Sequence, residues 1–175
     1  MLSECDPWEV PVKPSCFGKD WMALAAGDEK GYNAMTVAWG EVGTLWDRYD
    51  TKRHKVYPVA TVYVRPQRYT KEFLDREEFF TLSYLGKGHR KELGYLGSHT
   101  GRDSAKMAEC GLAPVFAYGT VYFAEAELVL VCRKLYRQDL EEASFVDRAL
   151  IERNYPERDF HTMYTGEIVR CLSIY

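Results

Sequence analysis

The sequence predicts a mainly β protein, a closed or nearly closed antiparallel barrel with short helices between its strands. The chain has 175 residues, of which 14% are aromatic, and aromatic residues are enriched in strands. Short runs of apolar and β-branched residues recur along the chain, and turns containing glycine separate them. Closing such strands into a barrel removes the exposed edges that an open sheet leaves.

Each strand is expected where an apolar or alternating run lies between turn residues. The 124–135 run is apolar on both faces, with Leu130 and Cys132 on one side and Val129 and Val131 on the other, so it predicts a strand covered on both sides. The expected strands cover 21–26, 33–39, 58–65, 79–85, 115–123 (two short strands around a turn), 124–135 and 160–174, and the expected helices cover 70–78, 87–96, 104–110 and 145–154.

The remaining segments are expected to be irregular. Residues 1–18 contain three prolines, which fix φ and remove a backbone donor, so they predict an extended arm. Residues 40–57 are glycine-containing and then charged, which indicates a loop. The length and the absence of linkers predict one domain over residues 1–175.

Composition limits the partners and the compartment. A net charge of -3 argues against nucleic acid as the main partner, because phosphate backbones need a basic surface. No apolar run approaches the roughly 20 residues of a membrane span, and the first residues lack the pattern of a signal peptide, so we expect a cytoplasmic protein. The five cysteines are scattered and odd in number, which predicts reduced, mostly buried thiols and neither a disulfide framework nor a metal site.

Common catalytic motifs are absent from the sequence. It contains no Gly-x-Ser-x-Gly elbow, no His-Glu-x-x-His helix and no phosphate loop ending in Gly-Lys-Ser/Thr. It also lacks Gly-x-Gly-x-x-Gly after a strand, so a Rossmann dinucleotide site is not supported.

Polar residues interrupt the 33–40 run, Asn-Ala-Met-Thr-Val-Ala-Trp-Gly. Asn33 and Thr36 fall within an otherwise apolar strand, and buried polar side chains cost free energy unless they find partners. We interpret this strand as one wall of a polar and aromatic pocket.

Two segments place basic side chains at expected helix starts, 64–70 and 98–106. Backbone amides at a helix start, joined by Arg68 in the first segment or Lys106 in the second, make an anion site, so both are candidates for holding a phosphate. The alternative for the first segment is an ordinary surface turn capped by Thr70. For the second segment the favoured alternative is an ordinary capped turn with solvated charges, in which Asp103 is the expected cap.

His161 is the candidate for chemistry. It lies at the mouth of the last expected strand, where an imidazole can serve as a neutral donor or titrate near pH 7. A structural or solvent-exposed histidine is the alternative. His54, His89 and His99 lie in charged or turn contexts and are expected to face solvent, with no metal cluster.

Six segments, in order, resemble the flavin reductase-like, FMN-binding split β-barrel family, in its flavoredoxin-like branch. The resemblance implies a six-stranded antiparallel split β-barrel of Greek-key type, a homodimer, and FMN bound non-covalently near the dimer interface. The matching segments are 33–40, 64–70, 80–83, Gly101-Arg102-Asp103 with Lys106, 132–136, and 159–161 with Gly166 and Glu167.

The resemblance also assigns roles to residues. It implies that His161 is catalytic, on the nicotinamide side of the flavin. Thr100 stands where serine is more usual in the family, which retains a hydroxyl. The implied FMN-binding residues are Asn33, Ala34, Met35, Thr36, Trp39, Arg65, Arg68, Tyr69, Thr70, Ser98, Thr100, Gly101, Arg102, Asp103 and Lys106.

Three functions fit these observations. The first is a flavin reductase that transfers hydride from NADH or NADPH to the flavin. The second is an electron carrier with prosthetic FMN that serves a redox protein partner, for which the basic residues of the 40–57 segment offer a docking surface. The third is a non-enzymatic flavin-binding module. The basic residues in question are Arg48, Lys52, Arg53 and Lys55, for which a solvated loop is the favoured interpretation.

Overall fold

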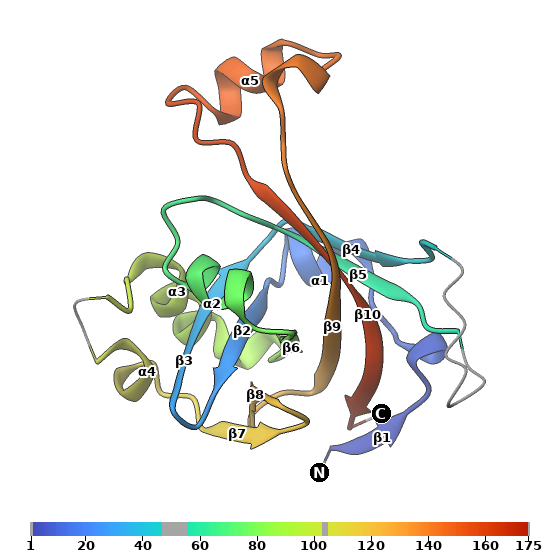
Figure 1. The fold of residues 1–175 in the computed structure, drawn as a ribbon. Coiled ribbons are helices and arrows are strands. Elements are labelled where there is room, and N and C mark those ends of the chain that lie inside the picture. Colours follow the sequence, from blue (N-terminus) through green and yellow to red (C-terminus); the bar gives the residue numbers. More distant parts are fainter. Residues whose placement is uncertain (1, 47–55, 103–104, 175) are drawn as a thin grey trace.

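The computed structural model describes residues 2–46, 56–102 and 105–174. A curled antiparallel sheet forms a half-barrel, and short helices surround it (Figure 1). This confirms the predicted mainly β split-barrel class. The strands of six or more residues in the described ranges are β2 (Met22–Asp28), β3 (Gly31–Val37), β5 (Val59–Val64), β6 (Phe79–Tyr84), β9 (Leu128–Asp139) and β10 (Thr162–Ser173).

The strand order in the sheet is β3-β2-β6-β9-β10-β5-β4, where β4 is the short strand Gly40–Gly43. The two longest strands, β9 and β10, pair along their lengths, and the register shifts twice between them. Strand β3, at one end of this order, continues through Trp39 into β4, at the other end. The carbonyl of Trp39 accepts a hydrogen bond of 3.3 Å from the amide of Tyr63 on β5, which links the two ends of the sheet.

The sheet also contains a short strand that the sequence did not predict. The predicted 40–57 loop begins instead as strand β4 (Gly40–Gly43), which pairs with β5. Gly40 lies so close to the ring of Phe17 that a Cβ would overlap it, so this packing depends on glycine. Residues 47–55, with the basic side chains considered for partner docking and His54, lie outside the described residues.

The N-terminal arm is more ordered than its prolines suggested. It forms strand β1 (Ser3–Cys5), a 3-10 helix η1 (Pro7–Glu9) and helix α1 (Pro14–Gly18). Strand β1 pairs with the end of β10, and the indole nitrogen of Trp8 donates a hydrogen bond of 3.1 Å to the carbonyl of Val56. The prediction of an extended arm is therefore wrong, because pairing with β10 supplies partners that a local pattern does not show.

Cys5 and Cys171 form a disulfide, which contradicts the prediction of reduced thiols for this pair. They are 166 residues apart but lie directly opposite each other in the β1–β10 register. The spacing carried no signal, because only strand pairing brings them together. Cys16, Cys110 and Cys132 are free and buried, as predicted.

The helices and the remaining hairpin lie around the sheet (Figure 1). The helix predicted over 104–110 is shorter, and its start is at Lys106. The predicted short strands around Tyr118 form a hairpin. The elements are α2 (Thr70–Arg76), the 3-10 helix η2 (Lys87–His89), α3 (Arg90–Ser98), α4 (Lys106–Glu109), β7 (Pro114–Ala117) and β8 (Thr120–Phe123).

The sheet is covered on both faces by separate apolar clusters. Leu130 and Cys132 of β9 belong to the inner cluster, which also contains Phe80 of β6. Val129 and Val131 belong to the outer cluster, packed under α3 and the β7–β8 hairpin. All four β9 side chains are fully buried, which confirms the expectation that this strand is covered on both sides.

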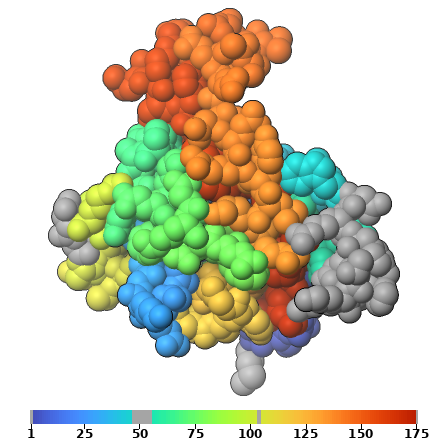
Figure 2. All heavy atoms as spheres, in the orientation of Figure 1, coloured from blue at the N-terminus to red at the C-terminus, as the bar shows by residue number. Residues whose placement is uncertain are grey.

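An arm projects from the barrel between β9 and β10 (Figures 1 and 2). It carries the 3-10 helix η3 (Glu142–Ser144) and helix α5 (Ala149–Asn154), so the helix predicted over 145–154 starts later. Val146 is fully exposed and Leu150 is 45% exposed on this arm. No helix in the described ranges is long and apolar enough to cross a membrane.

Candidate functional site

A polar pocket of about 200 Å³ lies where β3, the turn between β5 and α2, and the end of α3 meet. The structure brings eight of the predicted FMN-binding residues to this pocket. It is lined by Asn33, Met35, Gln67, Arg68, Tyr69, Thr70, Ser98, His99, Thr100 and Lys106. Gln67 and His99 were not predicted, although they are sequence neighbours of Arg68 and Ser98.

Two basic side chains make this pocket positive. Lys106, the first residue of α4, is only 3% exposed, and its ammonium donates a hydrogen bond of 2.7 Å to the carbonyl of Ala34. Arg68 lies in the turn after β5 and donates through Nη1 to the carbonyl of Gly97 at 2.6 Å. Within the described ranges neither cation forms an ion pair with a carboxylate, so the pocket suits an anion.

The buried ammonium has an altered acidity. Burial, and secondarily repulsion from Arg68, lower the pKa of Lys106 to about 8, although the Cys110 thiol opposes the shift. A bound anion would raise the pKa of Lys106 again, because its negative charge stabilises the protonated ammonium that burial and Arg68 disfavour.

Asn33 and Thr70 form the floor of the pocket. The Asn33 side-chain amide donates a hydrogen bond of 2.7 Å to the Thr70 hydroxyl, and both residues are buried. Thr70 is the first residue of α2 and makes no capping bond, so its predicted capping role is wrong. Its hydroxyl instead accepts the hydrogen bond from Asn33 on β3. A Cβ on Gly101 would overlap Asn33 Oδ1, so only glycine allows this approach.

Some predicted residues support the pocket without lining it. Ala34 contributes its carbonyl, while its methyl group packs in the outer cluster. Thr36 donates its hydroxyl to the carbonyl of Leu93, which ties β3 to α3. Arg102 lies at the rim, over the Tyr69 ring at 5.0 Å and paired with Glu72. Asp103, a predicted cap and binding residue, is outside the described residues.

His161, Trp39 and Tyr155 form a second cluster at the base of the projecting arm. The Trp39 ring lies 4.6 Å from the imidazole, and the Tyr155 hydroxyl is 2.9 Å from His161 Nδ1. His161 is 7% exposed, which excludes the alternative of a solvent-exposed histidine. Burial, and then the charge of Arg65, lower the pKa of His161 to about 4, so the imidazole is neutral at pH 7.

Arg65 joins the arm to the barrel. From the end of β5 its guanidinium forms an ion pair of 2.6 Å with Asp159 and donates a hydrogen bond of 2.7 Å to the carbonyl of Asn154. It also lies 5.1 Å above the Tyr155 ring. Its role here is to hold the arm, and it does not line the polar pocket.

The two clusters are neighbours in space. Arg65 lies over the ring of Tyr155, which contacts His161, and Arg68, three residues later in the same turn, lines the anion pocket. The five-residue segment 65–69 therefore connects the anion pocket to the imidazole. Tyr155 is the functional candidate that sequence reasoning missed, since one tyrosine among thirteen carries no local signal.

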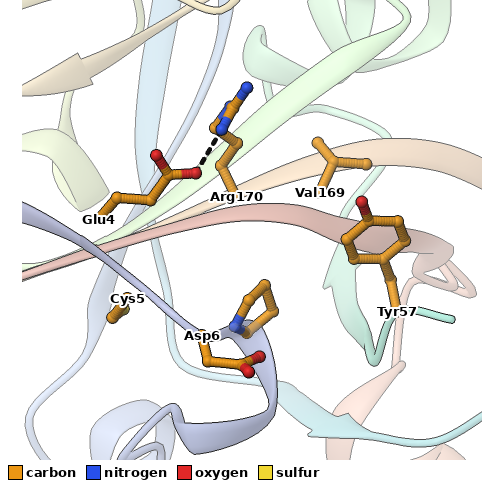
Figure 3. Close-up of a pocket in the computed structure, with 7 residues that line it drawn as sticks. Glu4, Cys5, Asp6, Tyr57, Val169 and Arg170 are labelled. Atoms are coloured by element: carbon orange, nitrogen blue, oxygen red, sulfur yellow. Dashed lines mark hydrogen bonds and ion pairs between the residues drawn. The ribbon is translucent and has the colours of Figure 1, made fainter. Parts of the chain in front are cut away.

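A larger cavity of about 670 Å³ lies elsewhere, between the N-terminal arm and the end of β10 (Figure 3). Glu4 and Arg170 are paired across it, and Asp6 and Tyr57 complete its polar lining. Arg170, the cation among its described lining residues, is already paired with a carboxylate, so this cavity does not offer the positive character of the smaller pocket. No group of side chains typical of a metal site is found in the part of the chain that the structure describes.

The solved structures with a similar fold include a flavoredoxin and an FMN-binding protein. Flavoredoxin from Methanosarcina acetivorans shares 21% identity over 88% of this chain and 68% of its own, with a TM-score of 0.61. The fold is that of the FMN-binding split barrels. An FMN-binding protein from Thermus thermophilus, with bound 1-cyclohex-2-enone, shares 17% identity over 99% of this chain and 80% of its own, with a TM-score of 0.63.

A third structure with the split-barrel fold binds nicotinamide and flavin fragments. It is an NADH:FAD oxidoreductase of Streptomyces globisporus C-1027 in complex with NAD and FAD fragments, and it shares 15% identity over 87% of this chain and 73% of its own, with a TM-score of 0.58. No protein-family model and no curated protein matches the sequence.

Proposed function

We propose that the protein is an FMN-binding oxidoreductase that uses NADH or NADPH to reduce flavin. The observation that carries the proposal is the pair of cations, buried Lys106 and partly buried Arg68, in one pocket of a split barrel. A phosphate monoester is the anion that this pair fits, because it accepts several charged hydrogen bonds at once.

The residues fit the cofactor in distinct ways. Lys106, Arg68 and the hydroxyls of Ser98 and Thr100 would hold the phosphate, and Gly101 leaves room for close approach of the backbone. When bound, FMN supplies the hydride and electron chemistry, and the protein supplies binding, orientation and charge. His161 would contribute a neutral imidazole beside it, since its lowered pKa keeps it uncharged at pH 7.

The absorbance spectrum of the purified protein, followed by anaerobic titration with NADH and NADPH, tests this function. A yellow protein after gel filtration would indicate retained flavin, and bleaching of the flavin absorbance by either nicotinamide would support reductase activity. Absence of bleaching with both would reject the reductase. The Lys106→Met variant, in the same titration, reports whether the pocket described above is responsible for the binding.

An electron carrier with prosthetic FMN is the second candidate. Two of the solved structures with this fold are flavoredoxins, from Methanosarcina acetivorans and Desulfovibrio vulgaris, at 21% and 19% identity. Retained flavin that is bleached by a partner reductase and not by nicotinamide would favour this function over the first.

We also propose that the protein acts as a homodimer. The projecting arm presents Val146 and Leu150 to solvent, and large exposed apolar side chains favour association. Sedimentation velocity of the intact chain and of a Val146→Asp variant tests this. A monomer at micromolar concentration would contradict the proposal.

A further inference from the structure

Tyr155 is buried and makes one polar contact through its side chain among the described residues. It is 2% exposed, and its hydroxyl lies 2.9 Å from His161 Nδ1. Its backbone amide ends helix α5 by donating to the carbonyl of Ile151 at 2.7 Å, so the backbone of Tyr155 is held at the end of the helix. Arg65 lies over the same ring and holds the neighbouring backbone.

The direction of the hydrogen bond follows from the acidities of its partners. Both groups are neutral at pH 7, because burial raises the pKa of Tyr155 and lowers that of His161. A phenol is a stronger acid than the N–H of a neutral imidazole, so the hydroxyl is the better donor of the two. The positive charge of Arg65 favours donation further, since it acts to lower the pKa of the phenol.

We propose that Tyr155 is a positioning residue that donates its hydroxyl proton to His161 Nδ1 and thereby fixes the imidazole as the Nε2–H tautomer. Nε2 has no hydrogen-bond partner in the described part of the chain, so its N–H is available to a ligand. The Trp39 ring, tilted by 33° at 4.6 Å, restricts rotation of the imidazole. The catalytic consequence of this inference rests on the proposed function, whereas the assignment of the tautomer does not depend on it.

The consequence concerns what His161 can do. An imidazole with a proton on Nε2 offers a hydrogen-bond donor, whereas the opposite tautomer would offer an acceptor there. His161 would therefore donate to an acceptor atom of the bound cofactor or reductant and would not abstract a proton. The charged or titratable groups that act on this imidazole are Tyr155, Arg65, Asp159 and Arg68, and none of them supplies a carboxylate hydrogen bond to the ring.

The tautomer can be measured directly. Long-range proton–nitrogen correlation spectra of the full chain, labelled with ¹⁵N-histidine, distinguish protonated from unprotonated ring nitrogens at neutral pH. We expect His161 to show an unprotonated Nδ1 and a protonated Nε2. Tyr155→Phe retains the ring and removes the hydroxyl, so we expect a mixture of tautomers in this variant. Tyr136→Phe, which changes an exposed tyrosine, is the matched control and should leave the spectrum unaltered.

Anaerobic flavin reduction supplies the functional readout. We expect Tyr155→Phe to reduce flavin about tenfold more slowly, the effect of losing one hydrogen bond that orients the donor, with flavin affinity unchanged within about twofold. A wild-type His161 that is protonated on Nδ1 would overturn the assignment, and this result does not depend on whether the variant folds. A folded Tyr155→Phe variant whose His161 keeps the wild-type tautomer would overturn it as well. Failure to bind FMN would contradict the proposed function alone.

Discussion

The buried ammonium of Lys106 predicts that FMN binding depends on pH. Its pKa falls from an ordinary 10.5 to about 8, which corresponds to about 3 kcal/mol that the charge costs in the folded protein at neutral pH. The unfolded chain holds this proton more tightly, so without ligand this group makes the fold more stable as pH rises from about 8 to 10.5. A bound phosphate would restore the higher pKa. FMN affinity should therefore fall by up to about tenfold for each pH unit above about 8.

Removing the charge tests the same reasoning. Lys106→Met keeps an unbranched side chain but loses a charged hydrogen bond worth roughly 1.5–3 kcal/mol, so FMN should bind roughly 10- to 150-fold more weakly at neutral pH. Its FMN affinity should no longer vary between about pH 7 and 9.5. Riboflavin lacks the phosphate, so its affinity should change little in either experiment.

Fluorescence titration of FMN and riboflavin measures these affinities, and thermal unfolding checks that each variant is folded. Lys91→Met, which removes an exposed lysine on α3, is the matched control. Equal weakening of both flavins by Lys106→Met, or an FMN affinity that stays level with pH in the wild-type protein, would refute the phosphate assignment.

Three further results are expected. Gly101→Ala should weaken FMN binding and lower the melting temperature, because the new methyl group overlaps Asn33 Oδ1; an unchanged variant would contradict the close approach. His161→Ala should slow anaerobic flavin reduction by about 10²-fold or more while flavin affinity changes little, and a selective loss of affinity would argue against a catalytic role. Cys5→Ser with Cys171→Ser should lower the free energy of unfolding by about 2–5 kcal/mol relative to the oxidised wild type, measured by urea denaturation, and should leave it close to that of the reduced wild type.

The sequence predicted the elements whose pattern is local. Strand β9 shows apolar residues on alternating faces, and both faces proved to be buried. The turns that contain Arg68 and Lys106 were recognised because basic residues and hydroxyls at helix starts have a direct chemical meaning, and the structure places both cations in one pocket.

The features that the sequence did not predict depend on pairing between distant segments. Strand β1 and the Cys5–Cys171 disulfide exist because the first residues lie against the end of β10, and no spacing rule indicates this. The contact between Tyr155 and His161 depends on how the arm returns to the barrel, which a six-residue separation leaves open. Thr70 fits a cap by type, but its hydroxyl is taken by Asn33 from a strand 37 residues earlier.

The Arg65 guanidinium links the projecting arm to the barrel, so the position of the arm is sensitive to changes at this side chain. Arg65 holds Asp159 and the Asn154 carbonyl from the end of β5, and both lie on the return path of the chain toward the imidazole. A solute anion that competes for this guanidinium would loosen that path and displace the imidazole ring. The same anion would also compete with the FMN phosphate at Lys106 and Arg68, so the salt in the assay would affect both turnover and flavin binding.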